Sequence, residues 1–359
     1  MHPCNNSILA ALLAGATLLA AAQPRPASLA NSQTPPGQAA PPTVDSDPVR
    51  SPDAGAAPGM APLKKQGKEG YILRTNVEEV VLNATVVGEN NQLVQNLTKG
   101  DFEIYEDGVK QNILSFQHTD LPVSIGLVID NSGSMYKKRP AVNKAALDLI
   151  EASNKEDQAF VVNFSDEAFI DQDFTSSVAK LREGLTHIDS RGGTALYDAV
   201  VASADKLAED AQRPKQVLIL ITDGEDNAST LDLEQTIRRV QQLSGPVIYS
   251  IGLLFGGEMD RGEVRRARRA LELLSSETGG MAFFPKSVMQ VDEIAGEVAR
   301  DIRTQYTLGY RSTKPTSIPG FRKVQVIARA KGMGKLEVRT RTGYYPNVRP
   351  RQTAEAMQP

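Results

Sequence analysis

The sequence VSIGLVIDNSGS at residues 123–134 joins an apolar run to a loop of oxygen-bearing side chains. The sequence QVLILITDGEDN at residues 216–227 has the same form, an apolar run followed by an acidic loop. Such runs are typical of strands buried on both faces of a sheet. A strand is also predicted at residues 158–164 and the next helix at residues 177–188. Residues 120–303 are therefore predicted to form an α/β domain, with a doubly wound, largely parallel sheet and helices on both faces.

The segments on either side of this domain have a β pattern. Residues 69–119 and 304–347 alternate apolar and polar side chains between turn residues, which predicts antiparallel strands, one of them at residues 111–117. Gly-Met-Gly at residues 332–334 is predicted to turn a hairpin between the strands beside it. Each segment alone has too few strands to be stable. We therefore expect the two segments to pair as one small, discontinuous antiparallel β module.

The N-terminus has the features of an export signal. Residues 8–22 are apolar and end in small residues, so residues 1–22 are predicted to be a secretory signal peptide. The protein is then expected in the periplasm, on the cell surface or secreted. Because no Lys or Arg precedes the apolar stretch, the alternative is an uncleaved anchor, which is the only membrane contact expected. Residues 23–68 are rich in Pro and Ala and are predicted to be a disordered tether, and residues 348–359 a disordered tail.

Composition narrows the classes of function. The 359 residues are 40% apolar and 23% charged, as in a globular protein, and the net charge of −3 gives no sign of a nucleic-acid partner. Cys4 is the only cysteine and lies in the predicted signal peptide. The mature chain is therefore expected to have no disulfide, no thiolate zinc site and no cysteine nucleophile. The sequence has no phosphate-binding Walker loop and no nucleophile elbow, and no small-molecule cofactor is predicted.

Oxygen-bearing side chains are expected to meet at one edge of the sheet. Asp130 and Asp223 follow the two most apolar runs, and ligands in such sheets bind beyond the carboxyl ends of the strands. Ser132 and Ser134 lie in the loop after Asp130, and Thr194 follows two glycines in a third loop. All five residues offer hard oxygen donors, which favours Mg²⁺, with Mn²⁺ or Ca²⁺ as alternatives, over zinc.

The charge of this donor set predicts a binding site. Three of the five donors are neutral hydroxyls and only two are carboxylates, so the protein is not expected to neutralise a divalent ion heavily. Mg²⁺ takes about six ligands, which leaves a coordination position for water or for a carboxylate from another molecule. Each loop alone is as well explained by an ordinary turn or a helix cap. The convergence of three loops favours the metal site.

The motifs resemble a known family. Asp-x-Ser-x-Ser at residues 130–134, Gly-Gly-Thr at residues 192–194 and Ile-Thr-Asp-Gly at residues 221–224 are similar to the metal-ion-dependent adhesion site of von Willebrand factor type A domains. The resemblance covers about residues 122–299. It implies that the hydroxyls of the set are direct metal ligands, and that the two Asp residues bind the ion directly or through water.

The flanking sequences resemble a bacterial subgroup of the same family, first described in acidobacteria. They are DFEIYEDG at residues 101–108, YTLGY at residues 306–310 and GYYP at residues 343–346. The resemblance implies no particular partner for the subgroup.

Further residues are candidates for a second layer around the metal ligands. They are Asn131, Gly193, Asp198 and Gly224. Asp198 lies one helical turn after Thr194, and an exposed helix position explains it equally well. Glu225 and Asp226 are expected to lie in a solvated turn.

These observations favour a non-enzymatic function. The first hypothesis is an exported, metal-dependent binding module that captures an Asp or Glu carboxylate of an unknown protein partner. One alternative is a metal-dependent phosphoester hydrolase, in which Asp198 or Glu225 would serve as the base. The other is an intracellular assembly factor that works with an ATP-driven partner, as some members of the family do.

Overall fold

The computed structural model describes residues 79–186, 190–243, 245–256 and 259–346. The segments predicted to be the signal peptide, the tether and the tail lie outside these residues. What the sequence indicates about export and cleavage therefore stays a prediction.

A six-stranded sheet forms the centre of the α/β domain in the described part of the chain. In spatial order the strands are β10 (Ala282–Phe283), β9 (Val247–Gly252), β8 (Lys215–Thr222), β5 (Val123–Asp130), β6 (Gln158–Phe164) and β7 (Ala168–Thr175). Neighbours from β10 to β6 are parallel. The chain builds outward from β5 to β6 and β7, then returns to β8 on the other side of β5. The strand order therefore reverses between β5 and β8, and the predicted doubly wound sheet is confirmed.

The edge strand β7 was not expected from the sequence. It runs antiparallel to β6, with register shifts along the pair. Most of its side chains are only partly buried, and the strand includes Asp171 and Asp173. An edge strand has one partner and needs no continuous apolar run, so the pattern that predicts the central strands is absent here.

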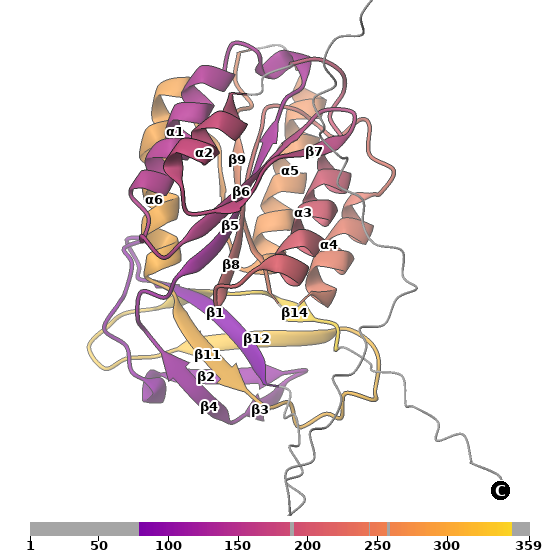
Figure 1. Ribbon diagram of the computed structural model, residues 1–359. Helices are drawn as coiled ribbons and strands as arrows, with labels where there is room; N and C mark the ends of the chain where they lie inside the picture. Colours follow the sequence, from indigo (N-terminus) through magenta and orange to yellow (C-terminus); the bar gives the residue numbers. More distant parts are fainter. Residues whose placement is uncertain (1–78, 187–189, 244, 257–258, 347–359) are drawn as a thin grey trace, which may run out of the picture. The chain divides into compact units, whose positions relative to one another are not determined.

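Helices cover both faces of the sheet (Figure 1). They are α1 (Arg139–Glu151), α2 (Val178–Leu185), α3 (Leu196–Asp210), α4 (Leu233–Gln242), α5 (Arg261–Thr278) and α6 (Val291–Arg303). Buried side chains of α1, α2 and α6 join one hydrophobic cluster, and those of α3, α4 and α5 join a second. The two clusters lie on opposite faces of the sheet, as the continuous apolar strands predict.

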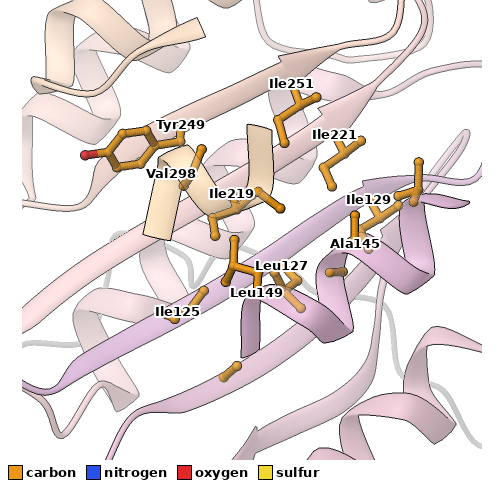
Figure 2. Packing of buried hydrophobic residues seen from close by; sticks show 14 of the residues in the cluster. Ile125, Leu127, Ile129, Ala145, Leu149, Ile219, Ile221, Tyr249, Ile251 and Val298 are labelled. Carbon is orange, nitrogen blue, oxygen red and sulfur yellow. The ribbon is translucent and has the colours of Figure 1, made fainter. Parts of the chain in front are cut away.

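The first cluster shows how alternate strand residues supply one face (Figure 2). On β5 the side chains of Ile125, Leu127 and Ile129 belong to it, whereas Val128 belongs to the other cluster. Residues from β8, β9, α1 and α6 also belong to this layer; those labelled are Ile219, Ile221, Tyr249, Ile251, Ala145, Leu149 and Val298. Burial on both faces removes these strands from water and holds their carboxyl ends in fixed positions.

Side-chain caps determine where the helices beside the site begin. Asp232 caps α4, and Asp260 caps α5 by accepting hydrogen bonds from the backbone N–H groups of Gly262 and Glu263. At the other end of α5, Gly279 has a φ of 91°, a conformation that favours glycine. A Cβ there would also lie 2.7 Å from the backbone nitrogen of Arg341.

The two flanking segments pair with each other in a β sandwich. One sheet has the order β13 (Glu337–Arg339), β1 (Val80–Val87), β11 (Tyr306–Tyr310) and β4 (Ile113–Gln117). The other has the order β14 (Gly343–Tyr344), β12 (Arg322–Ala328), β2 (Phe102–Glu106) and β3 (Val109–Gln111). Each central contact joins one end of the chain to the other, β1 to β11 and β2 to β12. The predicted discontinuous antiparallel β module is confirmed.

Two details of this β module differ from the sequence expectations. The strand predicted at residues 111–117 is interrupted at Asn112, and β3 and β4 belong to different sheets. The turn at Gly332, where φ is 81°, does not close a hairpin, because β12 pairs with β2 and β13 pairs with β1. The predicted hairpin is wrong because pairing with strands distant in sequence separates β12 from β13.

A buried polar cluster joins the β module to the α/β domain. The Tyr249 hydroxyl donates to Asp301 Oδ2 at 2.7 Å, and Arg339 Nη2 lies 2.8 Å from Asp301 Oδ1. Gln305 Nε2 donates to the Tyr249 hydroxyl at 3.1 Å.

Of the helices in the described ranges, none combines the length and apolar character needed to cross a bilayer.

Candidate metal centre

The two predicted metal-binding carboxylates lie at the same edge of the sheet. Strands β5 and β8 are parallel neighbours, with Ile129 level with Ile221. Asp130 ends β5, and Asp223 follows the end of β8. Both residues are buried. The expectation from the two apolar runs is confirmed, and the site lies where the strand order reverses.

A chain of hydrogen bonds links the loop after β5 to Asp223. The hydroxyls of Ser132 and Ser134 lie 3.1 Å apart. The Ser134 hydroxyl donates to Asp223 Oδ1 at 2.7 Å. Ser132 is the N-cap of a short 3-10 helix, η2 (Gly133–Met135), and Ser134 lies within that helix.

Asp130 organises this loop from beneath. Its Oδ1 accepts a hydrogen bond from the Ser132 backbone N–H at 2.8 Å, and its Oδ2 accepts one from the Thr222 hydroxyl at 2.5 Å. Burial raises the pKa of the Asp130 carboxyl to about 6, and the negative charge of Asp223 adds to the rise. A cation near both carboxylates would relieve this repulsion. Sequence reasoning missed Thr222, which immediately precedes Asp223 in the same motif.

Thr194 reaches the same place from the third loop. Its backbone N–H donates to Asn227 Oδ1 at 2.9 Å, and its carbonyl accepts from the Asn227 N–H at 3.0 Å. Gly193 N–H donates to Asp166 Oδ1 at 2.7 Å. Thr194, Ser134 and Asp223 line one cavity. The structure therefore brings together all five predicted residues, with Asn227 and Asp166 as supports that the sequence did not indicate.

Three of the four second-layer candidates lie against these loops. The Asn131 backbone N–H donates to the Phe164 carbonyl at 2.6 Å, so Asn131 fixes the start of its loop. A Cβ on Gly193 would lie 2.6 Å from Asn227 Oδ1. A Cβ on Gly224 would lie 3.3 Å from the Thr194 hydroxyl oxygen. Both glycines are thus placed where a side chain would crowd the loops.

The remaining acidic candidates are engaged elsewhere. The Asp198 carboxylate accepts hydrogen bonds from the backbone N–H groups of Thr230 and Leu231 at 2.9 and 3.1 Å. Glu225 forms an ion pair with Arg266 at 2.6 Å. Asp226 accepts from the Ser229 hydroxyl at 2.5 Å. Asp198 therefore supports a neighbouring loop, and the turn expected to be merely solvated is held by specific contacts.

Lys138 is part of the site and was not predicted. Its Nζ lies 2.6 Å from Asp223 Oδ2, and its side chain is only 12% exposed. The same Nζ lies 5.5 Å from the centre of the Phe255 ring. The basic pair at Lys137 and Lys138 shortly after Ser134 was the available signal, but the sequence does not show which lysine turns toward Asp223.

An open cavity adjoins the carboxylate. Its volume is about 440 Å³. One part of its wall is acidic and hydroxyl-bearing, and another is apolar, with contributions from Leu254, Phe255, Met259 and Val264. The oxygen cluster is therefore accessible from a space large enough to admit a side chain of another molecule.

The donor atoms fit a divalent ion with oxygen ligands. Octahedral Mg²⁺ binds oxygen at about 2.0–2.1 Å, so neighbouring ligands are about 2.9 Å apart. The two spacings along the Ser132, Ser134 and Asp223 oxygens are 3.1 and 2.7 Å. In the described ranges no three His, Cys, Asp or Glu side chains gather as a metal site. The candidate centre instead combines two carboxylates with three hydroxyls.

The family of the α/β domain follows from its sequence. Residues 125–225 match the von Willebrand factor type A domain family. The chain contains a von Willebrand factor type A domain. The resemblance inferred from the site motifs is confirmed, and the A domain is a fold of the protein-binding, adhesion type. Assignment to the bacterial subgroup stays a prediction.

Two relatives share parts of the chain. Inter-alpha-trypsin inhibitor heavy chain H6 of Homo sapiens is 23% identical over 237 residues, which are 61% of this chain and 18% of that protein. The uncharacterized protein sll0103 of Synechocystis is 28% identical over 109 residues, which are 30% of this chain and 26% of that protein. The chain thus spans less than a third of the length of these curated relatives.

Solved structures with some likeness include other proteins with this type of domain. A von Willebrand factor type A protein from Catenulispora acidiphila has a TM-score of 0.45 at 15% identity, covering 76% of this chain and 74% of that one. The von Willebrand factor domain of the type V pilus tip protein Mfa5 from Porphyromonas gingivalis has a TM-score of 0.41 at 14% identity, covering 51% of this chain and 97% of that one.

Proposed function

We propose that this chain is an exported binding module whose A domain holds a divalent cation and captures an Asp or Glu side chain of a partner protein. The cation is Mg²⁺, with Mn²⁺ or Ca²⁺ as alternatives. The observation that carries the proposal is the convergence of Ser134, Thr194 and Asp223, from three separate loops, on one open cavity.

Each residue of the set would have a distinct part. The hydroxyls of Ser132, Ser134 and Thr194 would bind the ion directly. Asp223 and Asp130 would bind it directly or through water. Asp130 already accepts hydrogen bonds from the Ser132 N–H and the Thr222 hydroxyl, so it holds the backbone at Ser132 in position in addition to supplying charge.

The character of the donors favours capture of an anion. A bound divalent ion supplies positive charge and an exchangeable coordination position. The five protein donors leave one of about six coordination positions for an exchangeable ligand, and the cavity beside Asp223 gives an external carboxylate a path of approach. The apolar wall at Leu254 and Phe255 offers contact area for the rest of a partner residue.

The hydrolase alternative gains nothing from the positions of its candidate bases. Asp198 holds the backbone of Thr230 and Leu231, and Glu225 is paired with Arg266.

The proposal that the protein is exported rests on the apolar stretch at residues 8–22 and its small-residue end. An export signal would also place the protein apart from the ATP-driven partners of the assembly alternative.

The test of the metal site is thermal stability with and without the ion. At about 100 times the dissociation constant, Mg²⁺ should stabilise the folded chain by about 2.7 kcal/mol, and EDTA should reverse the gain. Thr194→Ala should remove this response and keep a cooperative melt. Thr230→Ala is the matched control, because Thr230 is bonded to Asp198 outside the set, and it should keep the full response. A melting curve indifferent to Mg²⁺ and Mn²⁺ would refute the metal site.

The same proteins test the partner. The wild-type chain should retain a protein from envelope fractions in Mg²⁺ and release it in EDTA, whereas Asp130→Ala should retain nothing. The captured protein should lose binding when one Asp or Glu is replaced by its amide. Retention that survives EDTA would show that capture does not use the ion.

A further inference from the structure

The Lys138 ammonium forms an ion pair with Asp223, one of the two carboxylates of the proposed metal site. Asp223 Oδ2 lies 2.6 Å from Lys138 Nζ, and Asp223 Oδ1 accepts from the Ser134 hydroxyl at 2.7 Å. Both oxygens of the Asp223 carboxylate therefore have partners from this chain. The Asp223 side chain is fully buried and that of Lys138 is 12% exposed, so water screens this pair less than it screens an exposed one.

The backbone fixes where Lys138 can reach. Its N–H donates to the Met135 carbonyl at 2.9 Å, and its own carbonyl accepts from the Val142 N–H at 3.1 Å. These bonds anchor the residue between η2 and the first turn of α1. The side chain then lies back over the metal loop, with its Nζ between Asp223 and the ring of Phe255. The ammonium is stabilised both by the negative charge of the carboxylate and by a cation–π interaction with the face of the ring.

We propose that Lys138 is an internal cation that competes with the divalent ion for Asp223, and so sets the metal affinity of the site. This inference rests on the proposed function, because it needs the ion to use Asp223. A single positive charge close to Asp223 lowers the gain from adding a double one, since the two cations repel each other and share one carboxylate. Loading with metal then requires the ammonium to leave Asp223 Oδ2.

Two consequences follow. Where no ion is bound, the Lys138 ammonium would be the positive charge that satisfies the buried Asp223 carboxylate, so Lys138 should stabilise the metal-free protein. The donor set also binds the ion more weakly than the same oxygens would without the lysine. Because Lys138 lines the cavity, its release from Asp223 also changes the charge that a partner meets there.

The test is a Mn²⁺ titration of the full chain, followed by electron paramagnetic resonance of the free ion at constant ionic strength. Lys138→Met should bind Mn²⁺ at least about tenfold more tightly than wild type, a change of about 1.4 kcal/mol. Lys138→Gln gives a second neutral variant that keeps a hydrogen-bond donor, and it should behave in the same way. Lys138→Arg, which keeps the charge, should stay near wild type.

Lys137→Met is the matched control. It removes the same charge from the neighbouring, exposed position and should change the affinity less than about twofold. The metal-free melting temperature supplies an independent readout. It should fall in Lys138→Met, and the difference from wild type should close at saturating Mn²⁺ because the ion then supplies the missing positive charge.

The outcomes separate this inference from the proposed function. If wild type binds Mn²⁺ and the two neutral variants bind it no more tightly, Lys138 is not a competitor and the metal site stands. If all the proteins melt cooperatively and none binds Mn²⁺, the metal site itself is wrong and the inference falls with it. Equal gains in Lys138→Met and Lys137→Met would reduce the effect to general electrostatics and would also overturn the proposal.

Discussion

Two buried carboxylates in this molecule are neutralised in different ways. In the β module, Glu106 is 2% exposed, and it accepts hydrogen bonds from the hydroxyls of Tyr310 at 2.8 Å, Tyr344 at 2.9 Å and Ser312 at 2.5 Å. The guanidinium of Arg322, itself fully buried, lies 3.6 Å from Glu106 Oε1. In the A domain, Asp223 has a hydroxyl and an ammonium as partners, but it also lines an open cavity.

The difference separates a structural cluster from a binding cluster. Glu106 is on β2, and its partners come from the other end of the chain, so its bonds hold the two segments of the β module in register. Burial raises the pKa of the Tyr310 hydroxyl, which stays protonated and donates to the carboxylate. Asp223 has partners that can be exchanged, because Ser134 is exposed and Lys138 is a flexible side chain beside a cavity. The enclosed Glu106 cluster contributes to stability, whereas the cavity beside Asp223 leaves that carboxylate accessible to an ion.

The largest expected effect comes from removing one half of the β module. A chain that ends at Thr304 lacks β11 and β12, the central partners of β1 and β2. Residues 79–117 should then lose cooperative structure, because a few unpaired strands are not stable alone. Amide hydrogen exchange would report this loss as an absence of slow amides in β1 and β2. A chain that ends at Asn347 is the control, and slow exchange in the shorter chain would contradict the pairing.

The next largest effect is expected at the sealed carboxylate. Glu106→Ala leaves Arg322 as a buried charge without its carboxylate, and also leaves two tyrosine hydroxyls without an acceptor. The loss in free energy of unfolding should be about 3–5 kcal/mol, measured by urea denaturation. Glu103→Ala on the same strand is the control. Glu103 pairs with exposed Lys110 and Arg329, so that loss should be much smaller than the loss in Glu106→Ala.

The sequence predicts most of this architecture because its strongest signals are local. The apolar runs before Asp130 and Asp223 indicate central strands, and parallel strands must present their carboxyl ends at one edge. Four of the five proposed ligands lie at or just beyond the carboxyl ends of those strands, so their convergence can be predicted without knowing any side-chain contact. Thr194 comes from the loop before α3. The β module was predictable for a different reason: neither flanking segment could be stable alone.

What the sequence does not predict depends on distant pairing or on side-chain direction. Strand β7 lacks an apolar run because it has a partner on one side only. The turn at Gly332 is encoded locally, yet β13 leaves β12 for β1. Lys137 and Lys138 are identical in type, and only the start of α1 determines that the second turns toward Asp223. Asp198 matched the site by spacing, but its carboxylate holds the loop at Thr230.

The smallest effect is expected at the open carboxylate, and it tests the contrast most directly. Asp223→Asn and Glu106→Gln make the same chemical change at the two clusters. In EDTA, Asp223→Asn should cost about 1–3 kcal/mol, because the amide oxygen can still accept from Ser134, while the Lys138 side chain, 12% exposed, regains part of its solvation. Glu106→Gln should cost clearly more, because Arg322 has no exposed surface through which to regain solvent. Urea denaturation of both variants beside wild type measures the difference. Equal losses in free energy of unfolding would show that the Asp223 cluster is as structural as the Glu106 cluster. The interpretation of the cavity beside Asp223 as a site where an ion replaces Lys138 would then be wrong.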